Sequence, residues 1–518
     1  MKKLIKYLTA AVLLLASVTS LWFLLSNLSA IGPALYLLLV ITIVLLALSV
    51  GLLSPKFYTN LAAALSTVAG SRKKTILLCS LIVLLGLLLR FSFYVHFDGY
   101  RPISDPETFY GAAQSIANGH GLKGNFLTAF FPYLAAYDSS LGLVMKLMGN
   151  PWLSVIVLNS FFDLLAAAVV YLFVRRLTGP KSVAPLAAFA LWVLSPFGIL
   201  FSVQALPIII VNFFVILVLY LGYLLCEGIK IRNTKRAIGL SVALGLAVGI
   251  ANCFRPTFTV FIVVLLAYLA FLVVTHLGQA KELAVLAVAG LVIVSGIFLG
   301  IQKLNVVLVS HETGFQAPSN SGGLSVYLGA NWESNGRWNA ADGQRTLYLS
   351  KIYGDNYEAI QNQLTKDGID RYKSYGIGGT LSLFVRKLNE FSTTQNFMYN
   401  ANDSIVNYTQ SKIAKLYNVY ILLFIYGLFA VCALYLYGQA QRAVRGLGLT
   451  NPIILLVALT MLGFFLSDMF VEAASRYAQI MYPLFIVVAA LFVQQKSESR
   501  QTSGTLPVPR RSPRTLKQ

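Results

Sequence analysis

Long apolar runs separated by short polar links dominate the chain. About twelve runs have the 17–25 residues that an apolar helix needs to cross a bilayer. The pattern therefore predicts an all-α polytopic membrane protein. The predicted spans fall at 7–25, 31–53, 75–95, 152–174, 182–201, 205–226, 237–253, 256–275, 283–303, 416–437, 450–470 and 477–495.

Composition supports this class. The chain is 57% hydrophobic and 11% charged, whereas a soluble domain carries about 25% charged residues. The 4 cysteines lie in or beside apolar runs, so we expect packing residues and neither a metal site nor a disulfide framework.

The net charge of +21 comes mainly from short basic links between the spans. Basic links of this kind mark the cytoplasmic loops of a membrane protein. The positive charge is therefore explained by membrane topology, and we expect membrane lipids rather than nucleic acid as partners. With the N-terminus inside, the segments 96–151 and 304–415 lie outside, and they hold four and nine of the 19 acidic residues. We expect a multi-pass protein of a cell membrane, as in a bacterial inner membrane, with its active site on the extracytoplasmic side.

The same threading predicts the domain organisation. Two extra N-terminal spans and a link occupy 1–74, and the first span is retained rather than cleaved as a signal peptide. The spans of 75–303 and 416–495 flank a large outer cap at 304–415. The basic tail at 496–518, rich in Pro and Ser, is predicted to be disordered on anionic lipid.

The two outer segments carry their own helix signals. In the first, Asp105 is the predicted N-cap of a helix over 108–118, and an amphipathic piece over 132–148 is expected to lie flat on the membrane. In the second, a strand-like stretch over 324–328 precedes helical patterns at 360–375 and 381–389. We expect this segment to pack on the bundle and on the first outer segment.

Asp105 is the first candidate for chemistry. A carboxylate at the outer end of a span is suited to act as a general base or to help hold a divalent cation. A plain helix cap is the alternative. For Glu107, two residues on, the alternative is a favourable charge in the first helical turn.

Two arginines lie at other outer turns. Arg255 follows the span 237–253, and Arg476 precedes the last span. A phosphate group is the partner that arginine suits best. The alternatives are snorkelling to the headgroups for Arg255, and for Arg476 an ion pair with Asp468 or Glu472. Common hydrolase and nucleotide-binding motifs such as HExxH, the P-loop and GxSxG are absent from the sequence.

Four segments in chain order resemble membrane glycosyltransferases of the GT-C class, of the protein O-mannosyltransferase-like and aminoarabinose-transferase-like kind. They are DPETFYGAAQSIANGHG at 105–121, GIANCFRPT at 249–257, the Asn- and Gly-rich stretch at 320–338, and SRY with a following proline at 475–483. The first two spans lie outside the resemblance.

The resemblance implies inverting transfer of a hexosyl or pentosyl group from a polyprenyl-phosphate sugar donor to a hydroxyl of a protein, lipid or glycan. It also implies Asp105 as the catalytic carboxylate, acting as a base or linked to a divalent cation. From their positions at outer turns, we expect Arg255 and Arg476 to bind the donor phosphate. Substrate contacts are expected from Glu107, Tyr110, Asn331, Trp332 and Tyr477.

Two features keep other functions open. Pro106 separates Asp105 from Glu107, and 201–207 lacks the acidic residue that many relatives carry there. A non-catalytic scaffold is therefore one alternative. A transporter or flippase for a lipid-linked sugar is the other, although few polar residues lie inside the predicted spans.

Overall fold

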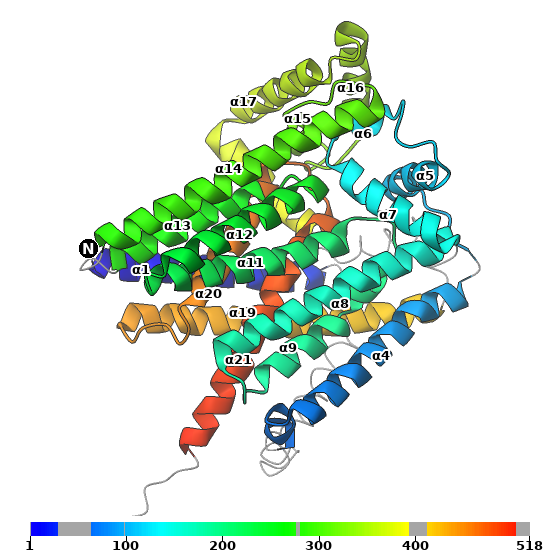
Figure 1. The fold of residues 1–518 in the computed structure, drawn as a ribbon. Coiled ribbons are helices and arrows are strands. Elements are labelled where there is room, and N and C mark those ends of the chain that lie inside the picture. Colours follow the sequence, from blue (N-terminus) through cyan, green and yellow to red (C-terminus); the bar gives the residue numbers. More distant parts are fainter. Residues whose placement is uncertain (1, 30–63, 98, 276–279, 393–411, 504–518) are drawn as a thin grey trace, which may run out of the picture.

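The computed structural model describes residues 2–29, 64–97, 99–275, 280–392 and 412–503, and within them every regular element is a helix (Figure 1). Ten candidate spans are long and apolar enough to cross a membrane, which confirms the predicted class. They lie in α1 (Lys2–Ser29), α4 (Arg72–His96), α8 (Pro151–Thr178), α9 (Ala184–Val193) with α10 (Pro196–Ser202), α11 (Ile208–Lys230), α12 (Thr234–Phe254), α14 (Ala280–Thr313), α19 (Lys412–Arg445), α20 (Ile453–Phe470), and η3 (Ser475–Met481) with α21 (Tyr482–Ser503).

The two other predicted spans differ from these ten. The stretch 256–275 forms α13 (Thr259–Thr275), an apolar helix of 17 residues. The predicted span 31–53 lies outside the described residues. Several helices also run past their predicted ends. Among them, α14 continues beyond 303 to Thr313 and α19 beyond 437 to Arg445. Helix α21 continues to Ser503, so the start of the predicted disordered tail is helical.

The outer surface of the bundle is apolar. Leu77 and Leu88 of α4 and Val285, Val292 and Leu299 of α14 all expose more than half of their surface. A soluble protein keeps exposed apolar patches small. These faces are therefore suited to contact lipid chains.

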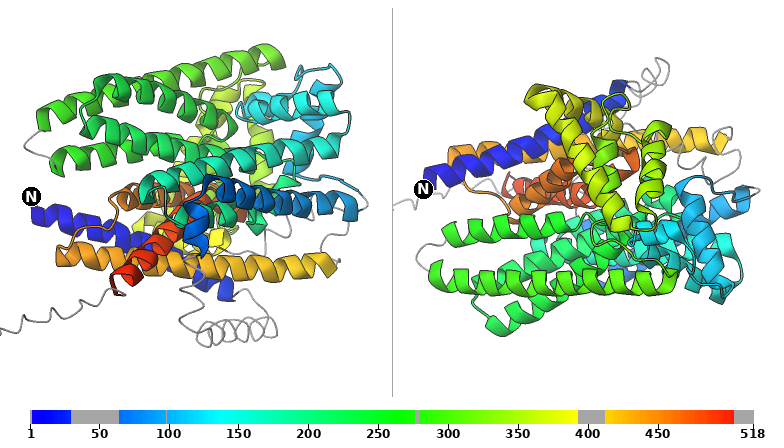
Figure 2. Two further views of the ribbon diagram at one scale, coloured as in Figure 1. Left: turned by 60° about the horizontal axis from the view of Figure 1, so that its bottom comes forward. Right: turned by 90° about the horizontal axis from the view of Figure 1, so that it is seen from above.

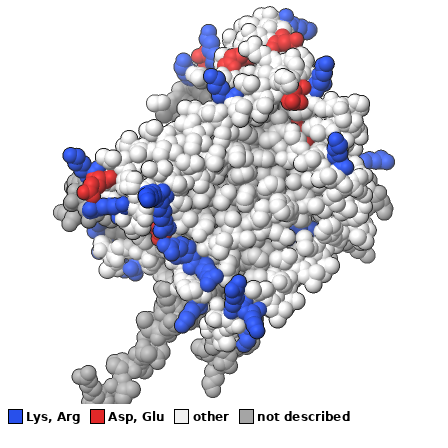
Figure 3. Space-filling view, in the orientation of Figure 1, with Lys and Arg blue, Asp and Glu red and all other residues white. Residues whose placement is uncertain are grey.

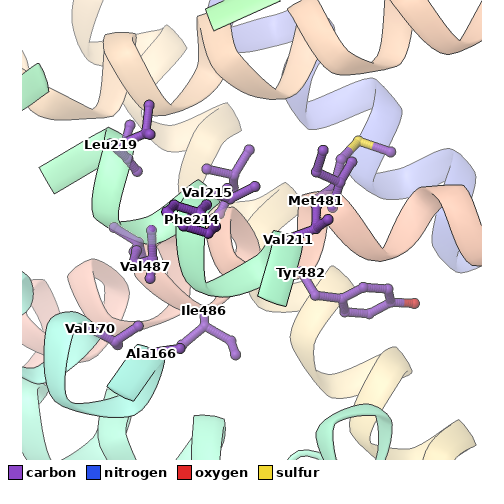
Figure 4. Close-up of a cluster of buried hydrophobic side chains, with 14 of the residues drawn as sticks. Ala166, Val170, Val211, Phe214, Val215, Leu219, Met481, Tyr482, Ile486 and Val487 are labelled. Carbon is purple, nitrogen blue, oxygen red and sulfur yellow. The ribbon is translucent and has the colours of Figure 1, made fainter. Parts of the chain in front are cut away.

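The interior of the bundle joins helices that are distant in the sequence. Figure 4 shows Ala166 and Val170 of α8 facing Phe214 of α11 and Ile486 of α21, all of them buried. Because α21 follows directly after η3, this packing holds the turn before η3 in place. That turn carries part of the candidate site.

Charged side chains separate toward different parts of the molecule. In Figure 3, Lys and Arg gather along the lower left edge, charges of both signs cover the top, and a broad band between them is nearly free of charge. We call the first region the basic end and the second the cap end. The basic end contains the starts of α4 and α12 and the ends of α8, α11 and α19, which carry Arg72, Lys73, Arg175, Arg176, Lys230, Lys235, Arg236 and Arg442, with Arg232 in the link between α11 and α12.

The first outer segment forms α5 (Asp105–Ala117), α6 (Phe126–Phe130) and α7 (Leu134–Met148). The helix predicted over 108–118 is confirmed, but the prediction that Asp105 is its N-cap was wrong. Ser104 is the capping residue, with φ 60°, and Asp105 already belongs to the helix. Its carboxylate is used elsewhere, as described below. The orientation of α7 on a membrane stays a prediction.

The cap consists of α15 (Gly323–Gly329), α16 (Ala340–Tyr353) and α17 (Tyr357–Ser392), seen at the top of Figure 1. The strand predicted over 324–328 was wrong, because a short apolar run fits either period. As a helix, α15 buries Tyr327 against Phe130, Leu349 and Ile360. The helices predicted at 360–375 and 381–389 are both present in α17, which breaks at Gly376.

The cap packs on the first outer segment, as predicted. Phe130 of α6 lies in the same apolar cluster as the cap residue Tyr357, with ring centroids 5.7 Å apart. The end of α14 is bonded to the first outer segment, since the Thr313 carbonyl accepts a 2.9 Å hydrogen bond from the Gly124 amide. The right-hand view of Figure 2 looks onto the cap, where α16 and α17 lie across the bundle.

Candidate functional site

Three turns at the cap end bring Asp105, Arg255 and Arg476 into one cluster. Asp105 starts α5, Arg255 directly follows α12 as its C-cap, and Arg476 lies in η3. The Arg476 guanidinium donates a hydrogen bond to the Asp105 carboxylate and forms an ion pair with it. The arginine side chain is 20% exposed and the aspartate side chain 49% exposed, so solvent reaches the carboxylate.

Tyr477 links the two arginines. The Arg255 guanidinium lies 4.2 Å from the centre of the Tyr477 ring, and that of Arg476 lies 5.3 Å from it. Cations at these distances are attracted by the ring quadrupole. The Tyr477 hydroxyl donates a 3.0 Å hydrogen bond to Glu472. The side chain is therefore held both at its ring and at its hydroxyl.

Local sequence explains the position of Arg255. The following proline disfavours helical backbone at Arg255, which is extended at φ −159° and ψ 125°. Helix α12 therefore ends there, while the Arg255 amide still bonds to the Ala251 carbonyl at 3.1 Å. The side chain projects from this break toward Tyr477.

The backbone before Asp105 is strained. Ser104 has φ 60° and ψ −136°, a conformation that costs a non-glycine residue about 1–3 kcal/mol and is concentrated at functional sites. The turn starts α5 at Asp105 and brings its carboxylate to Arg476. It is held without a side-chain capping bond from Ser104.

Two further carboxylates lie behind the arginines. Burial raises the pKa of Glu472, and the Arg476 charge opposes that rise. Asp468 is 3% exposed, and among the described residues its Oδ2 atom has no hydrogen-bond partner. The charges of Arg255 and Lys387 both act on Asp468. The site therefore holds more acidic groups than its exposed surface suggests.

Lys387 was missed by sequence reasoning. It is fully buried in α17, and its ammonium donates to the carbonyls of Gly329 at 3.1 Å, Met469 at 2.6 Å and Val471. Burial lowers its pKa to about 7, against the opposing charges of Asp468 and Glu472. The available signal was its spacing from Leu383 and Phe391, both on the buried face of the helix.

Tyr133 was also missed. It precedes α7, and the charges of Asp105, Glu472 and Arg255 all act on its hydroxyl. Burial raises the pKa of Tyr133, and the two carboxylates add to the rise. An aromatic residue in an amphipathic stretch gives no sequence signal for such a position.

The other predicted contact residues have different surroundings. Glu107 is exposed on α5, and the Tyr110 ring packs 5.1 Å from that of Tyr100. Asn331 bonds Asp342 at 2.8 Å and accepts from the Glu333 amide at 2.9 Å, which organises the cap loop.

The loop that contains Trp332 reaches the site through its backbone. The Arg386 guanidinium stacks over the Trp332 ring, 4.2 Å from the ring centroid. Four residues after Trp332, the Gly336 carbonyl accepts a 2.7 Å hydrogen bond from the Ala473 amide. The cap loop is therefore bonded directly to the turn that carries Glu472 and Arg476.

The fit of the site to a metal ion is poor. Across the residues that the structure describes, no group of three or more His, Cys, Asp or Glu side chains is placed to hold one, and the Asp105 carboxylate is paired with an arginine. A divalent cation at Asp105 stays a prediction of the resemblance, and the chemistry below uses none.

A second charged pair is buried within the spans. Arg90 of α4, 1% exposed, pairs with Asp163 of α8 and donates to the Val193 carbonyl at 3.0 Å. The Trp192 indole donates to the other Asp163 oxygen at 2.9 Å. Partners on three helices compensate both charges, which is the condition for charge inside a bilayer.

Fold and site together define a polytopic α-helical membrane protein with a charged, partly exposed cluster at the cap end of its bundle. No protein-family model and no curated protein sequence matches the chain. Its structure is similar to the crystal structure of ArnT from Cupriavidus metallidurans bound to undecaprenyl phosphate. The match covers 84% of this chain and 79% of that chain, with 13% identity and a TM-score of 0.33. The case for a function therefore rests on the site.

Proposed function

We propose that the protein is an integral-membrane glycosyltransferase of GT-C type. It transfers a sugar from a polyprenyl-phosphate donor to an acceptor hydroxyl at the extracytoplasmic face, with inversion at the anomeric carbon. One observation carries the proposal: at the end of the spans two arginines lie against a single tyrosine ring, and one of them is paired with a carboxylate from a third turn.

The arginines suit the leaving group. A lipid-linked phosphate would lie where apolar helices end and cations begin. Arg255 follows the last residue of one candidate span, and Arg476 is the first residue of another. As the bond to the anomeric carbon breaks, its electron pair passes to a phosphate oxygen. Preorganised guanidinium groups stabilise that developing charge.

Asp105 suits the acceptor. In the resting site its carboxylate is bound to Arg476. A donor phosphate competes for the same guanidinium and would free the carboxylate to take the acceptor proton. The acceptor oxygen then bonds to the anomeric carbon on the face opposite the phosphate, which inverts its configuration. Donor binding and base activation are thereby linked.

A transporter or flippase is the rival function, and the buried pair Arg90–Asp163 is the observation that favours it. The two charges satisfy each other, and Trp192 and backbone carbonyls take further contacts. This closed arrangement leaves the pair suited to join helices rather than to carry a substrate.

The deciding experiment is a transfer assay. Membrane fractions with the wild-type protein, Asp105→Asn or Asp355→Asn receive radiolabelled polyprenyl-phosphate sugars, with and without chelator. Asp355 is an exposed cap residue and serves as the matched control. We expect label to reach a product with wild type and the control, and a loss of about 10²–10⁴-fold with Asp105→Asn, the usual contribution of a general base.

Two results would contradict this assignment. Full transfer by a folded Asp105→Asn protein would remove Asp105 from the role of base. Donor that crosses the membrane in reconstituted vesicles without any transfer to a product would establish the flippase instead.

A further inference from the structure

A cavity lies at the basic end of the bundle, on the opposite side of the spans from the candidate site. It is formed where α8 and α11 end and where α12 and α20 begin. Charged, aromatic and amide side chains line it, among them Arg176, Tyr223, Glu227, Lys230, Arg236 and Tyr268. Nothing in the proposed transfer reaction uses this cavity.

The charges in the cavity are unequal. Three cations face one carboxylate. Glu227 is already engaged, because its Oε2 atom pairs with Arg176 at 3.0 Å and with Arg236 at 3.8 Å, while its Oε1 atom accepts from the Tyr223 hydroxyl at 2.6 Å. No carboxylate lies within ion-pair distance of Lys230 among the described residues. The cavity therefore keeps a net positive charge.

The surroundings extend this positive character. Helix α20 begins at the cavity with Asn451, Pro452 and Ile453 on its wall. The positive end of the helix dipole favours an anion there. The helix dipole adds to the positive charge that the side chains already give the cavity.

The walls also fit the membrane surface. Tyr223 and Tyr268 line the cavity, and tyrosine is enriched at the level of lipid headgroups. Tyr268 lies inside α13 and is 2% exposed, so a buried aromatic ring lines the cavity together with the charged side chains. A ligand that joins a phosphate to apolar groups matches this mixed lining.

We propose that this cavity binds the phosphate headgroup of an anionic glycerophospholipid from the leaflet at the basic end. The guanidinium groups of Arg176 and Arg236 and the Lys230 ammonium would donate to the phosphate oxygens. Basic pockets between spans are a known way to hold anionic headgroups. The site would tie a structural lipid to α8, α11, α12 and α20 at one point.

The test is lipid binding to the full-length protein in a neutral detergent, followed by native mass spectrometry. Phosphatidylglycerol is titrated against phosphatidylcholine, and glycerol 3-phosphate is added as a soluble competitor. We expect phosphatidylglycerol to bind more tightly, and Lys230→Gln and Arg236→Gln each to weaken it about five-fold, near the effect of one basic residue at a lipid surface.

Lys235→Gln is the matched control, because Lys235 carries the same charge in the same link but is exposed and does not line the cavity. Phosphatidylcholine binding should be the same in all variants, and the apparent melting temperature of each confirms folding.

Equal losses in Lys235→Gln and Arg236→Gln would overturn the cavity as the site. Full displacement by glycerol 3-phosphate at an equal concentration would identify a soluble anion and overturn the lipid assignment. Because sugar transfer is not measured, this result is independent of the proposed function.

Discussion

At the scale of single residues, the site is organised by charges that are compensated before any substrate arrives. Asp105 is paired with Arg476, and Glu472 accepts from Tyr477. Lys387 is the extreme case, a buried ammonium that holds three carbonyls and thereby joins the cap to the turn after α20.

The titration of Lys387 gives a prediction of stability against pH. Its folded pKa is about 7 and its ordinary value 10.5, so between these values the unfolded chain binds more protons than the folded one. Stability contributed by this group should therefore be constant below about pH 7 and rise as the pH increases toward 10.5.

Apparent melting temperatures of wild type and Lys387→Met, measured from pH 6 to 9, test this. The wild-type value should rise relative to the variant above about pH 7. Lys373→Met is the control, since Lys373 is exposed. A difference between wild type and Lys387→Met that does not change with pH would contradict a folded pKa near 7 for Lys387.

At the scale of elements, the cap is joined to the bundle through contacts with no spare space. A methyl group added at Gly329 would lie 2.4 Å from the Val471 carbonyl oxygen. Gly329→Ala should therefore push α15 away from the turn and destabilise the protein by about 1–3 kcal/mol, the usual range for overpacking.

Gly343→Ala is the matched control. Its nearest neighbour would be a Trp338 ring atom at 3.8 Å, and alanine favours the helix α16. Limited proteolysis of the cap measures both variants, with faster cleavage expected for Gly329→Ala alone. Equal cleavage of the two would mean that α15 can move away from the turn without loss.

The elements also show what a sequence can and cannot predict. Hydropathy identified the spans because a bilayer requires about 20 apolar residues per helix. Polarity at the span ends made Asp105, Arg255 and Arg476 candidates. The pairing of Asp105 with Arg476, however, joins residues separated by 371 positions, and nothing local encodes that contact.

Tertiary contacts also decide surroundings that residue type does not indicate. Asn331 has the residue type of a substrate contact, which stays a prediction, and its side chain also bonds Asp342 and completes a turn of the cap loop. Lys387 has the residue type of a surface position, yet its ammonium donates hydrogen bonds to the carbonyls of Gly329 in α15 and Met469 in α20. Tertiary contacts decided both cases.

At the scale of the whole molecule, the separation of charge predicts a topology. Lys235 lies at the basic end and Asp355 in the cap, and both are exposed. In intact cells a membrane-impermeant maleimide should label Asp355→Cys at once and Lys235→Cys only after permeabilisation. The native thiols are buried or half-buried and give a low background. Labelling of both positions from the same side would contradict the orientation.

The Asp105–Arg476 pair has one more consequence. The carboxylate acts as an internal competitor for the guanidinium, so part of the donor's binding energy is consumed in displacing it. In Asp105→Asn that competitor is gone. The variant that should lose transfer should therefore bind polyprenyl phosphate more tightly than wild type, and affinity and turnover should move in opposite directions.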